Sequence, residues 1–430
     1  MKKMMLAVLS RMLLLSFKIL ARLSDPVLVS FLKKLESLMQ ISGGNEAVVL
    51  PIRELREIAQ NDPPGLAAIR DIILAARKEQ FISLLRGMLK HHIFAKQTAK
   101  TPALKKMIAG RMITIGIFGA APEATILKRA YEQIDGVLVK SMADPDRAET
   151  LVPQFNALEI TAGFEGISEV AAVAFEKKIP VSLSHSGLTT PSQVRQFFTI
   201  AGQNRTPLRI FYPYLYFSPY STTRWLLKSN LLGEIATIRI KATLAGKGGE
   251  IAAVKPEQTF YLNHPAFDHF LLLPYLGGAV DKMTAYCNPM LEIKGGQALI
   301  NCKFKQPGRY GLLDCSYAPA MFIRSKLYPY DLEVEIAGSD GIIWLNKGMA
   351  ERTFQAPIQV RVGQQAFSYG VESGMQTDFS SAYQVAAAEF ALIAHGHPYH
   401  PVLEADEIIS TYELRARVYE ASDSQDVIQL

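Results

Sequence analysis

A histidine between two serines, in the segment VSLSHSGLTT at residues 181–190, follows directly after an apolar, β-prone run. Serine beside histidine could form a nucleophile and its base. Neighbouring side chains of an extended segment point to opposite faces, however, and Ser186 lacks a G-x-S-x-G motif. The spacing therefore argues against a Ser–His dyad. It leaves His185 as a group that can hydrogen-bond a substrate oxygen and shuttle a proton.

A second group of chemically capable side chains precedes an apolar helical pattern in HPAFDHFLLLPYLGG, residues 264–278. Asp268 and His269 stand at the predicted helix start, where they could act as a general acid and base. His264 is a possible substitute for His269, and a capped helix end with surface histidines is the alternative. The segment HGHPYHP at 395–401 lacks a Cys or carboxylate that would complete a metal site, so we predict no metal.

A glycine turn after a predicted strand indicates a dinucleotide site. In GAAPEA, Gly119, Ala121 and Ala124 take the three positions of a G-x-G-x-x-G/A loop, whose small residues let helix N-terminal amides approach a pyrophosphate. Asp144 ends the next predicted strand, where a carboxylate can bind the adenosine ribose and would repel a 2′-phosphate. The pattern favours NAD over NADP. The alternative is a Rossmann-like domain that binds no nucleotide.

The elements that must position these groups follow from changes in hydrophobic period. Strands alternate with helices over residues 112–232, which predicts a doubly wound parallel α/β sheet. Residues 233–430 predict a second, α+β domain of mostly antiparallel strands, with a tight turn at GSDG and two helices at about 379–395 and 403–421. Thr190-Pro191 predicts a helix start. Residues 1–111 are predicted to form a separate helical region.

Charge is distributed unevenly along the chain. Residues 1–111 carry 19 Lys and Arg against 8 Asp and Glu, whereas the remaining residues have a net negative charge. Residues 1–24 predict a basic amphipathic helix that lies on a membrane surface, binds a protein partner or packs within the chain's own N-terminal region. Charges interrupt it too often for a membrane span. The three cysteines are widely spaced, so a reducing, cytoplasmic setting is expected, with attachment at the inner membrane face as an option; no nucleic-acid partner is expected.

The order and spacing of several blocks resemble the Gfo/Idh/MocA oxidoreductases, the glucose-fructose oxidoreductase and inositol dehydrogenase family. These blocks are ITIGIFGAA, VKSMADPDRAE, IPVSLSHS, YFSPYSTTRWLLKSNLLGEIATIRI and the C-terminal stretch from EFALIAHGHPYHP onward. The resemblance covers about residues 112–430. It implies a Rossmann domain, a second domain with an open sheet, and a hydride exchanged between a nicotinamide and a sugar-like or other hydroxylated small molecule. It also implies a homo-oligomer, either a dimer or a tetramer.

The resemblance carries site residues onto this sequence. The family's catalytic lysine, in an EKP motif, corresponds to His185, and its second-domain acid and histidine correspond to Asp268 and His269. The expected cofactor-binding positions are Phe118, Gly119, Ala120, Ala121, Asp144, Ala162 and Gly163. Because the EKP lysine is absent, a catalytically impaired nucleotide-binding or scaffold member, docked through its basic N-terminal region, is the alternative function.

Overall fold

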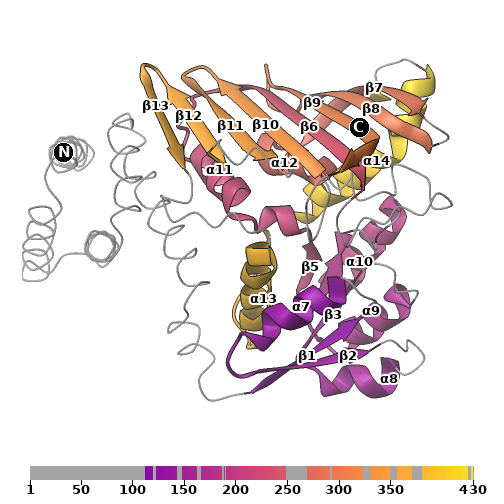
Figure 1. Cartoon of the computed structure of the whole chain (residues 1–430). Coiled ribbons are helices and arrows are strands. Elements are labelled where there is room, and N and C mark those ends of the chain that lie inside the picture. Colours follow the sequence, from indigo (N-terminus) through magenta and orange to yellow (C-terminus); the bar gives the residue numbers. More distant parts are fainter. Residues whose placement is uncertain are drawn as a thin grey trace, which may run out of the picture.

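The chain builds two β-sheets, one parallel and one mostly antiparallel, which share one continuous hydrophobic core (Figure 1). The computed structural model describes residues 112–119, 123–142, 148–161, 166–185, 188, 190–247, 269–290, 293–322, 330–348, 356–369, 380–424 and 428–429. The predicted helical region 1–111, including the amphipathic segment 1–24, lies outside these residues. None of the helices in the described part of the chain combines the length and apolar character needed to cross a membrane.

The parallel sheet has five strands in the order β2-β1-β3-β4-β5. Its strands and the helical segments between them are β1 (Ile113–Phe118), α7 (Glu123–Glu132), β2 (Val137–Met142), α8 (Ala148–Leu151), η2 (Val152–Gln154), β3 (Ala157–Ile160), α9 (Ile167–Glu176), β4 (Val181–Ser184), α10 (Pro191–Asn204) and β5 (Leu208–Phe211). As predicted, Thr190 caps α10, because its Oγ1 accepts a hydrogen bond from the Gln193 amide at 3.2 Å.

Strand order explains how this sheet is covered. The chain moves from β1 to β2 in one direction and from β2 through β3, β4 and β5 in the other. Right-handed crossovers then put α7 on one face and α8, α9 and α10 on the opposite face. Every residue of β3, β4 and β5 is buried, as expected for strands covered on both faces. The predicted doubly wound parallel sheet is confirmed, with β2 as an edge strand.

The second sheet has nine strands in the order β13-β12-β11-β10-β6-β9-β8-β7-β14. They are β6 (Ile235–Lys247), β7 (Val280–Met290), β8 (Ile293–Phe304), β9 (Tyr310–Phe322), β10 (Tyr330–Gly338), β11 (Gly341–Gly348), β12 (Ile358–Val362), β13 (Gln365–Tyr369) and β14 (Ile428–Gln429). Three helical segments precede or underlie it: η4 (Pro213–Leu215), α11 (Ser218–Lys228) and α12 (Leu272–Gly277).

Most neighbours in this sheet are antiparallel, and the predicted GSDG turn joins β10 to β11. The hairpin pattern has one exception. Strand β6 pairs with β9 in parallel and with β10 in the antiparallel sense, instead of pairing with β7, which follows it in sequence. The hairpins β7–β8 and β8–β9 return the chain to the edge of β6, so the sheet is mixed at this one pair.

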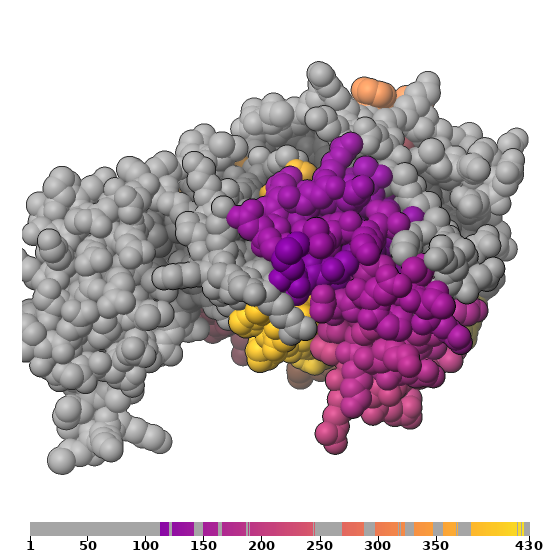
Figure 2. Space-filling view, turned by 90° about the horizontal axis from the view of Figure 1, so that it is seen from below, coloured from indigo at the N-terminus to yellow at the C-terminus, as the bar shows by residue number. Residues whose placement is uncertain are grey.

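Of the two C-terminal helices, one packs on the parallel sheet and the other connects the two sheets. Helix α13 (Ser380–Ala394) contacts α7 and β1, whereas α14 (Ala405–Ser424) contacts α10 and β7. Gln384 on α13 donates a hydrogen bond to Gln133 at 3.0 Å. In the space-filling view, yellow atoms of the C-terminal part lie next to the purple-to-magenta atoms of the parallel-sheet part (Figure 2). A helix far along the sequence thus covers the parallel sheet, and the predicted domain division near residue 233 stays a prediction.

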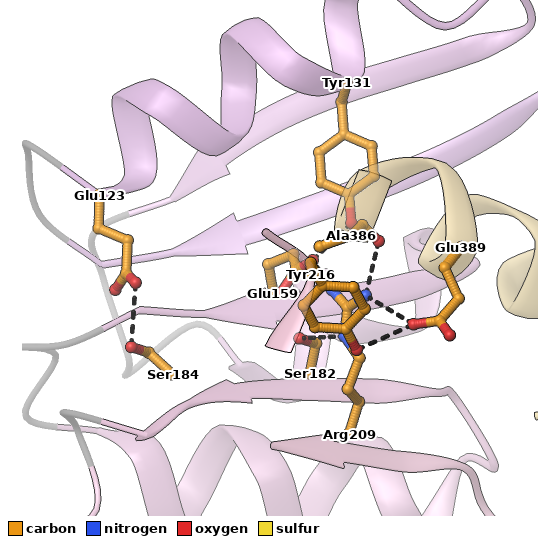
Figure 3. Close-up of polar contacts among 9 residues, drawn as sticks. All are labelled: Glu123, Tyr131, Glu159, Ser182, Ser184, Arg209, Tyr216, Ala386 and Glu389. Atoms are coloured by element: carbon orange, nitrogen blue, oxygen red, sulfur yellow. Dashed lines mark hydrogen bonds and ion pairs between the residues drawn. The ribbon is translucent and has the colours of Figure 1, made fainter. Parts of the chain in front are cut away.

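A buried ionic cluster joins α13 to the centre of the parallel sheet (Figure 3). Arg209 on β5 lies 2.6 Å from Glu159 Oε1 on β3 and donates to Ser182 Oγ on β4 at 3.0 Å. Its Nη1 donates to the Ala386 carbonyl on α13 at 2.6 Å and lies 3.5 Å from Glu389 Oε2. The cluster therefore connects three adjacent strands and one covering helix.

The charges of this cluster depend on one another. Burial raises the pKa of Glu159, and the positive charge of Arg209 opposes that increase. Burial lowers the pKa of Arg209, but Glu159 and the smaller contributions of Tyr216, Tyr131 and Glu389 together more than compensate, so the guanidinium stays charged. Tyr131 Oη donates to the same Glu159 oxygen at 2.5 Å. An ion pair in this environment is stable only while both partners are present.

Replacing Arg209 by Met tests this dependence. Arg209→Met leaves the Glu159 carboxylate buried without its counter-charge, so we expect the free energy of unfolding to fall by about 3–5 kcal/mol. Chemical denaturation of the full chain measures it. The matched control is Arg417→Met, which breaks an exposed pair with Glu420 and should cost at most about 1 kcal/mol. Equal losses in the two variants would show that the buried pair is not a major stabilising contact.

Candidate active site at the carboxyl edge of the parallel sheet

The site begins where β1 and β3 end side by side. Strand order reverses between these two strands, and open α/β sheets bind ligands in the crevice at such a switch point. Gly119 follows β1 with φ of +134°, a conformation that favours glycine. A Cβ added there would lie 1.9 Å from Thr161 Oγ1, just beyond β3. The predicted tight turn at Gly119 is therefore present, and it passes close to the end of β3.

Helix α7 starts at Glu123, and its first-turn amides face this edge. Unpaired amides and the helix dipole make such an end attractive to anions. The Glu123 side chain is only 6% exposed, and its Oε1 accepts a hydrogen bond from Ser184 Oγ at 3.1 Å (Figure 3). A carboxylate of the chain itself thus lies at the carboxyl edge of the sheet, between α7 and the end of β4.

Only part of the predicted cofactor-binding set belongs to the described residues. Phe118 is fully buried at the end of β1 and packs edge-to-face against Phe155, so its side chain belongs to the core. Gly119 forms the turn described above. The remaining predicted positions lie outside the described residues: Ala120, Ala121, Asp144, Ala162 and Gly163. Their roles stay predictions.

His185 follows β4 at the same edge and is 2% exposed. Its Nδ1 lies 3.0 Å from the carbonyl oxygen of Phe211 on β5. A carbonyl can only accept, so Nδ1 carries a proton, and Nε2 is the basic nitrogen of the neutral ring. Tyr412 on α14 donates to the His185 carbonyl at 2.8 Å. Two elements from distant parts of the chain therefore fix the backbone and the tautomer of this residue.

His269 is fully buried in the short turn that leads into α12. Its Nδ1 lies 3.3 Å from Tyr212 Oη, and its ring packs edge-to-face against Tyr214, with centroids 5.3 Å apart. As predicted, the histidine precedes a helix that runs to a Leu-Gly turn. Its predicted partner Asp268 and the possible substitute His264 lie outside the described residues.

Tyr212 brings the two predicted histidines together. Its ring lies 4.6 Å from the His185 ring, and its hydroxyl is the group that contacts His269. The residue directly follows β5, so the ends of two neighbouring strands supply His185 and Tyr212, while the chain before α12 supplies His269. The Tyr212 hydroxyl can exchange a proton with His269, because both groups can donate and accept, whereas its contact with His185 is ring packing.

Sequence reasoning missed Tyr212 and Glu123. Tyr212 lies in the aromatic run IFYPYLYFSPY, whose pattern predicts a strand; so dense an aromatic run beside a strand end is also a signal of a packed site. Glu123 lies within GAAPEA, where the predicted dinucleotide loop depends on the small residues. An acid directly at a predicted anion-binding helix start was the available signal.

Metal binding finds no support among the described residues. Within them, no three His, Cys, Asp or Glu side chains are grouped so that they could hold a metal ion. In the histidine-rich segment, the rings of His395 and His397 lie 6.0 Å apart.

Comparison with solved structures identifies the fold. The chain has the two-sheet fold of the Gfo/Idh/MocA oxidoreductases, as the sequence resemblance predicted. An oxidoreductase from Agrobacterium radiobacter, in complex with NAD+, L-tartaric acid and magnesium, matches at 14% identity and a TM-score of 0.59, over 74% of this chain and 98% of that one. A levoglucosan dehydrogenase, in complex with NADH and levoglucosan, matches at 12% identity and 0.56, over 74% and 99%.

A third similar structure is the scyllo-inositol dehydrogenase of Lactobacillus casei, at 13% identity and a TM-score of 0.56, over 74% of this chain and 98% of that one. No protein-family model matches the chain, and neither does any curated protein sequence. At such identities the likeness establishes the fold, whereas the chemistry has to be inferred from this chain's own residues.

The described residues fit a dinucleotide in their backbone and add one feature of their own. The switch point, the Gly119 turn and the start of α7 are features of a pyrophosphate site, and residues 120–122 between them lie outside the described residues. The Glu123 carboxylate adds negative charge to that site. The backbone at this edge therefore suits a pyrophosphate in shape, whereas the negative charge of Glu123 would repel it.

Substituting Gly119 tests the turn. Gly119→Ala would place a methyl group against Thr161 and strain a positive φ, so we expect a loss of about 1–3 kcal/mol in unfolding free energy. The control is Gly202→Ala in α10, where an added Cβ meets nothing within 4 Å and should stabilise the helix by about 0.5–1 kcal/mol. Thermal or chemical denaturation separates them. An unchanged unfolding free energy in Gly119→Ala would show that the turn can relax without cost.

Proposed function

We propose that the chain is an oxidoreductase that uses NAD, with NADP less favoured, to transfer a hydride to or from a carbon that bears a hydroxyl group. The substrate would be a sugar-like or other hydroxylated small molecule. One observation carries the proposal: His185, Tyr212 and His269 lie in contact at the carboxyl edge of a parallel sheet. Ligands of open α/β sheets bind at that edge. The structural neighbours that contain NAD+ or NADH add support.

The cofactor would be held by the predicted set around the Gly119 turn: Phe118, Gly119, Ala120, Ala121, Asp144, Ala162 and Gly163. When bound, NAD supplies the hydride acceptor for the oxidation of an alcohol. The task of the chain is then to bring the substrate carbon close and to remove the hydroxyl proton. As in other hydride transfers, the protein contributes binding, orientation and electrostatics.

His269 is the proposed proton-transfer group. During oxidation it accepts the proton of the substrate hydroxyl, and during reduction it returns that proton. Tyr212 Oη, 3.3 Å from His269 Nδ1, orients the ring; in the proposed tautomer Nδ1 donates to this oxygen, and Nε2 exchanges the proton with the substrate. Asp268 is proposed to support His269.

His185 is proposed to orient the substrate oxygen. Its Nδ1 proton is donated to the Phe211 carbonyl, and Nε2 is proposed to accept a hydrogen bond from a substrate hydroxyl. An imidazole at this position replaces the charged lysine of the family motif. It therefore contributes hydrogen bonding instead of a permanent positive charge. Oligomerisation, docking of residues 1–24 and the cytoplasmic setting stay predictions.

Turnover measurements test the assignment of the proton-transfer group. Nicotinamide fluorescence should report NADH binding, and a panel of inositols, aldoses and sugar acids should reveal turnover with NAD+. His269→Gln is expected to lower kcat by about 100-fold or more, the usual contribution of a general base, while the Kd for NADH changes little.

A gentler variant and a control accompany it. Tyr212→Phe keeps the ring against His185 and removes only the hydroxyl, so kcat should fall by about tenfold and its pH profile should move. His400→Gln alters an exposed histidine away from these contacts and should leave kcat unchanged. Unchanged kcat in both His269→Gln and Tyr212→Phe would show that His269 is not the proton-transfer group. Absence of NADH binding at millimolar concentration would reject the oxidoreductase itself.

A further inference from the structure

We propose that the Glu123 carboxylate acts as an internal anion that competes with the cofactor pyrophosphate for the start of α7. This inference rests on the proposed function, because it concerns regulation of the same cofactor site. It makes Glu123 the residue that sets dinucleotide affinity in this chain.

The position of the carboxylate follows from the strand order. Glu123 is the first residue of α7, which follows β1, whereas Ser184 is the last residue of β4. Strand β3 lies between β1 and β4. The 3.1 Å hydrogen bond from Ser184 to Glu123 therefore spans the carboxyl end of β3 (Figure 3). That span crosses the switch point, where a dinucleotide places its pyrophosphate.

The carboxylate is also well stabilised where it lies. The α7 start offers the positive end of a helix dipole, which favours a negative group. Ser184 adds a hydroxyl donor, and the side chain is 6% exposed, so bulk water screens its charge poorly. A carboxylate of the chain itself thus lies beside the helix start that a pyrophosphate would use.

A pyrophosphate at the same helix start would bring like charges within a few ångströms of each other. Such repulsion is strong where the effective dielectric constant is low. The cofactor must therefore displace the Glu123 side chain from Ser184 or bind with its phosphates farther from the helix. Either outcome weakens binding relative to a chain with a neutral side chain at this position.

The test compares three forms of the full chain by titration with NADH, ADP-ribose and adenosine. Glu123→Gln keeps the shape and can still accept from Ser184, but it removes the charge. We expect its Kd for NADH and for ADP-ribose to fall by about tenfold or more. Adenosine lacks phosphates, so its Kd should change less than about twofold.

Glu132→Gln is the matched control. Glu132 ends the same helix, pairs with Lys128 on the exposed surface, and should leave all three dissociation constants unchanged. Thermal melting checks that each variant is folded. Because burial makes Glu123 sensitive to substitution, Glu123→Ala serves as a second charge-removing variant, with the same expected gain in affinity.

The outcomes separate this inference from the proposed function. If the unmodified chain binds NADH and Glu123→Gln binds it equally or more weakly, the competition is wrong while the oxidoreductase proposal stands. Weaker binding by Glu123→Gln would make the carboxylate a ligand of the cofactor. If neither form binds NADH or ADP-ribose at millimolar concentration, both proposals fail. A gain for adenosine equal to that for NADH would also overturn the competition.

Discussion

The guanidinium group of Arg209 lies in the interior of the parallel sheet, where an unpaired charge would be too costly to retain. Glu159 on β3 neutralises it, and the donors and acceptors that complete the cluster come from β4, α7 and α13. Because each partner needs the others, the three strands and α13 have to be assembled together. The edge of the sheet that carries the candidate site is built on this arrangement, since Tyr212 follows the strand that contains Arg209 only three residues later.

The same strand also determines how the two histidines meet. Strand β5 ends at Phe211, whose carbonyl fixes the tautomer of His185, and the next residue contacts both imidazoles. Helix α14 holds the His185 backbone from outside the sheet through Tyr412. The site is thus supported by rigid strands and by a helix that is distant in sequence. Such support keeps polar side chains in fixed geometry inside a largely apolar interior.

Glu123 makes this site different from a simple anion-binding turn. A helix start that faces a strand end attracts negative charge, and in this chain a buried carboxylate supplies it. The contact joins α7 to the end of β4, so it serves packing as well as electrostatics. The glycine turn therefore favours binding of the cofactor, whereas the acid four residues later in the chain weakens it.

Local patterns determined much of the fold. The alternating strands and helices after residue 112, the cap at Thr190, the turn between β10 and β11, and helices α13 and α14 could all be predicted from hydrophobic period and turn chemistry. The position of His269 before a Leu-Gly helix end and the turn at Gly119 were predicted in the same way. These features depend on residues close together in the chain, and so the sequence alone carries their signal.

Contacts between distant residues were decided only by the tertiary structure. Nothing local indicates that Glu159 pairs with Arg209, that β6 lies parallel to β9, or that α13 covers the parallel sheet. Local patterns also do not indicate that His185 and His269 both contact Tyr212, or that Glu123 contacts Ser184. Each depends on which strands become neighbours, and strand order is set by burial and charge pairing over the whole domain. The sequence by itself determined the elements and the candidate groups, whereas packing decided which groups act together.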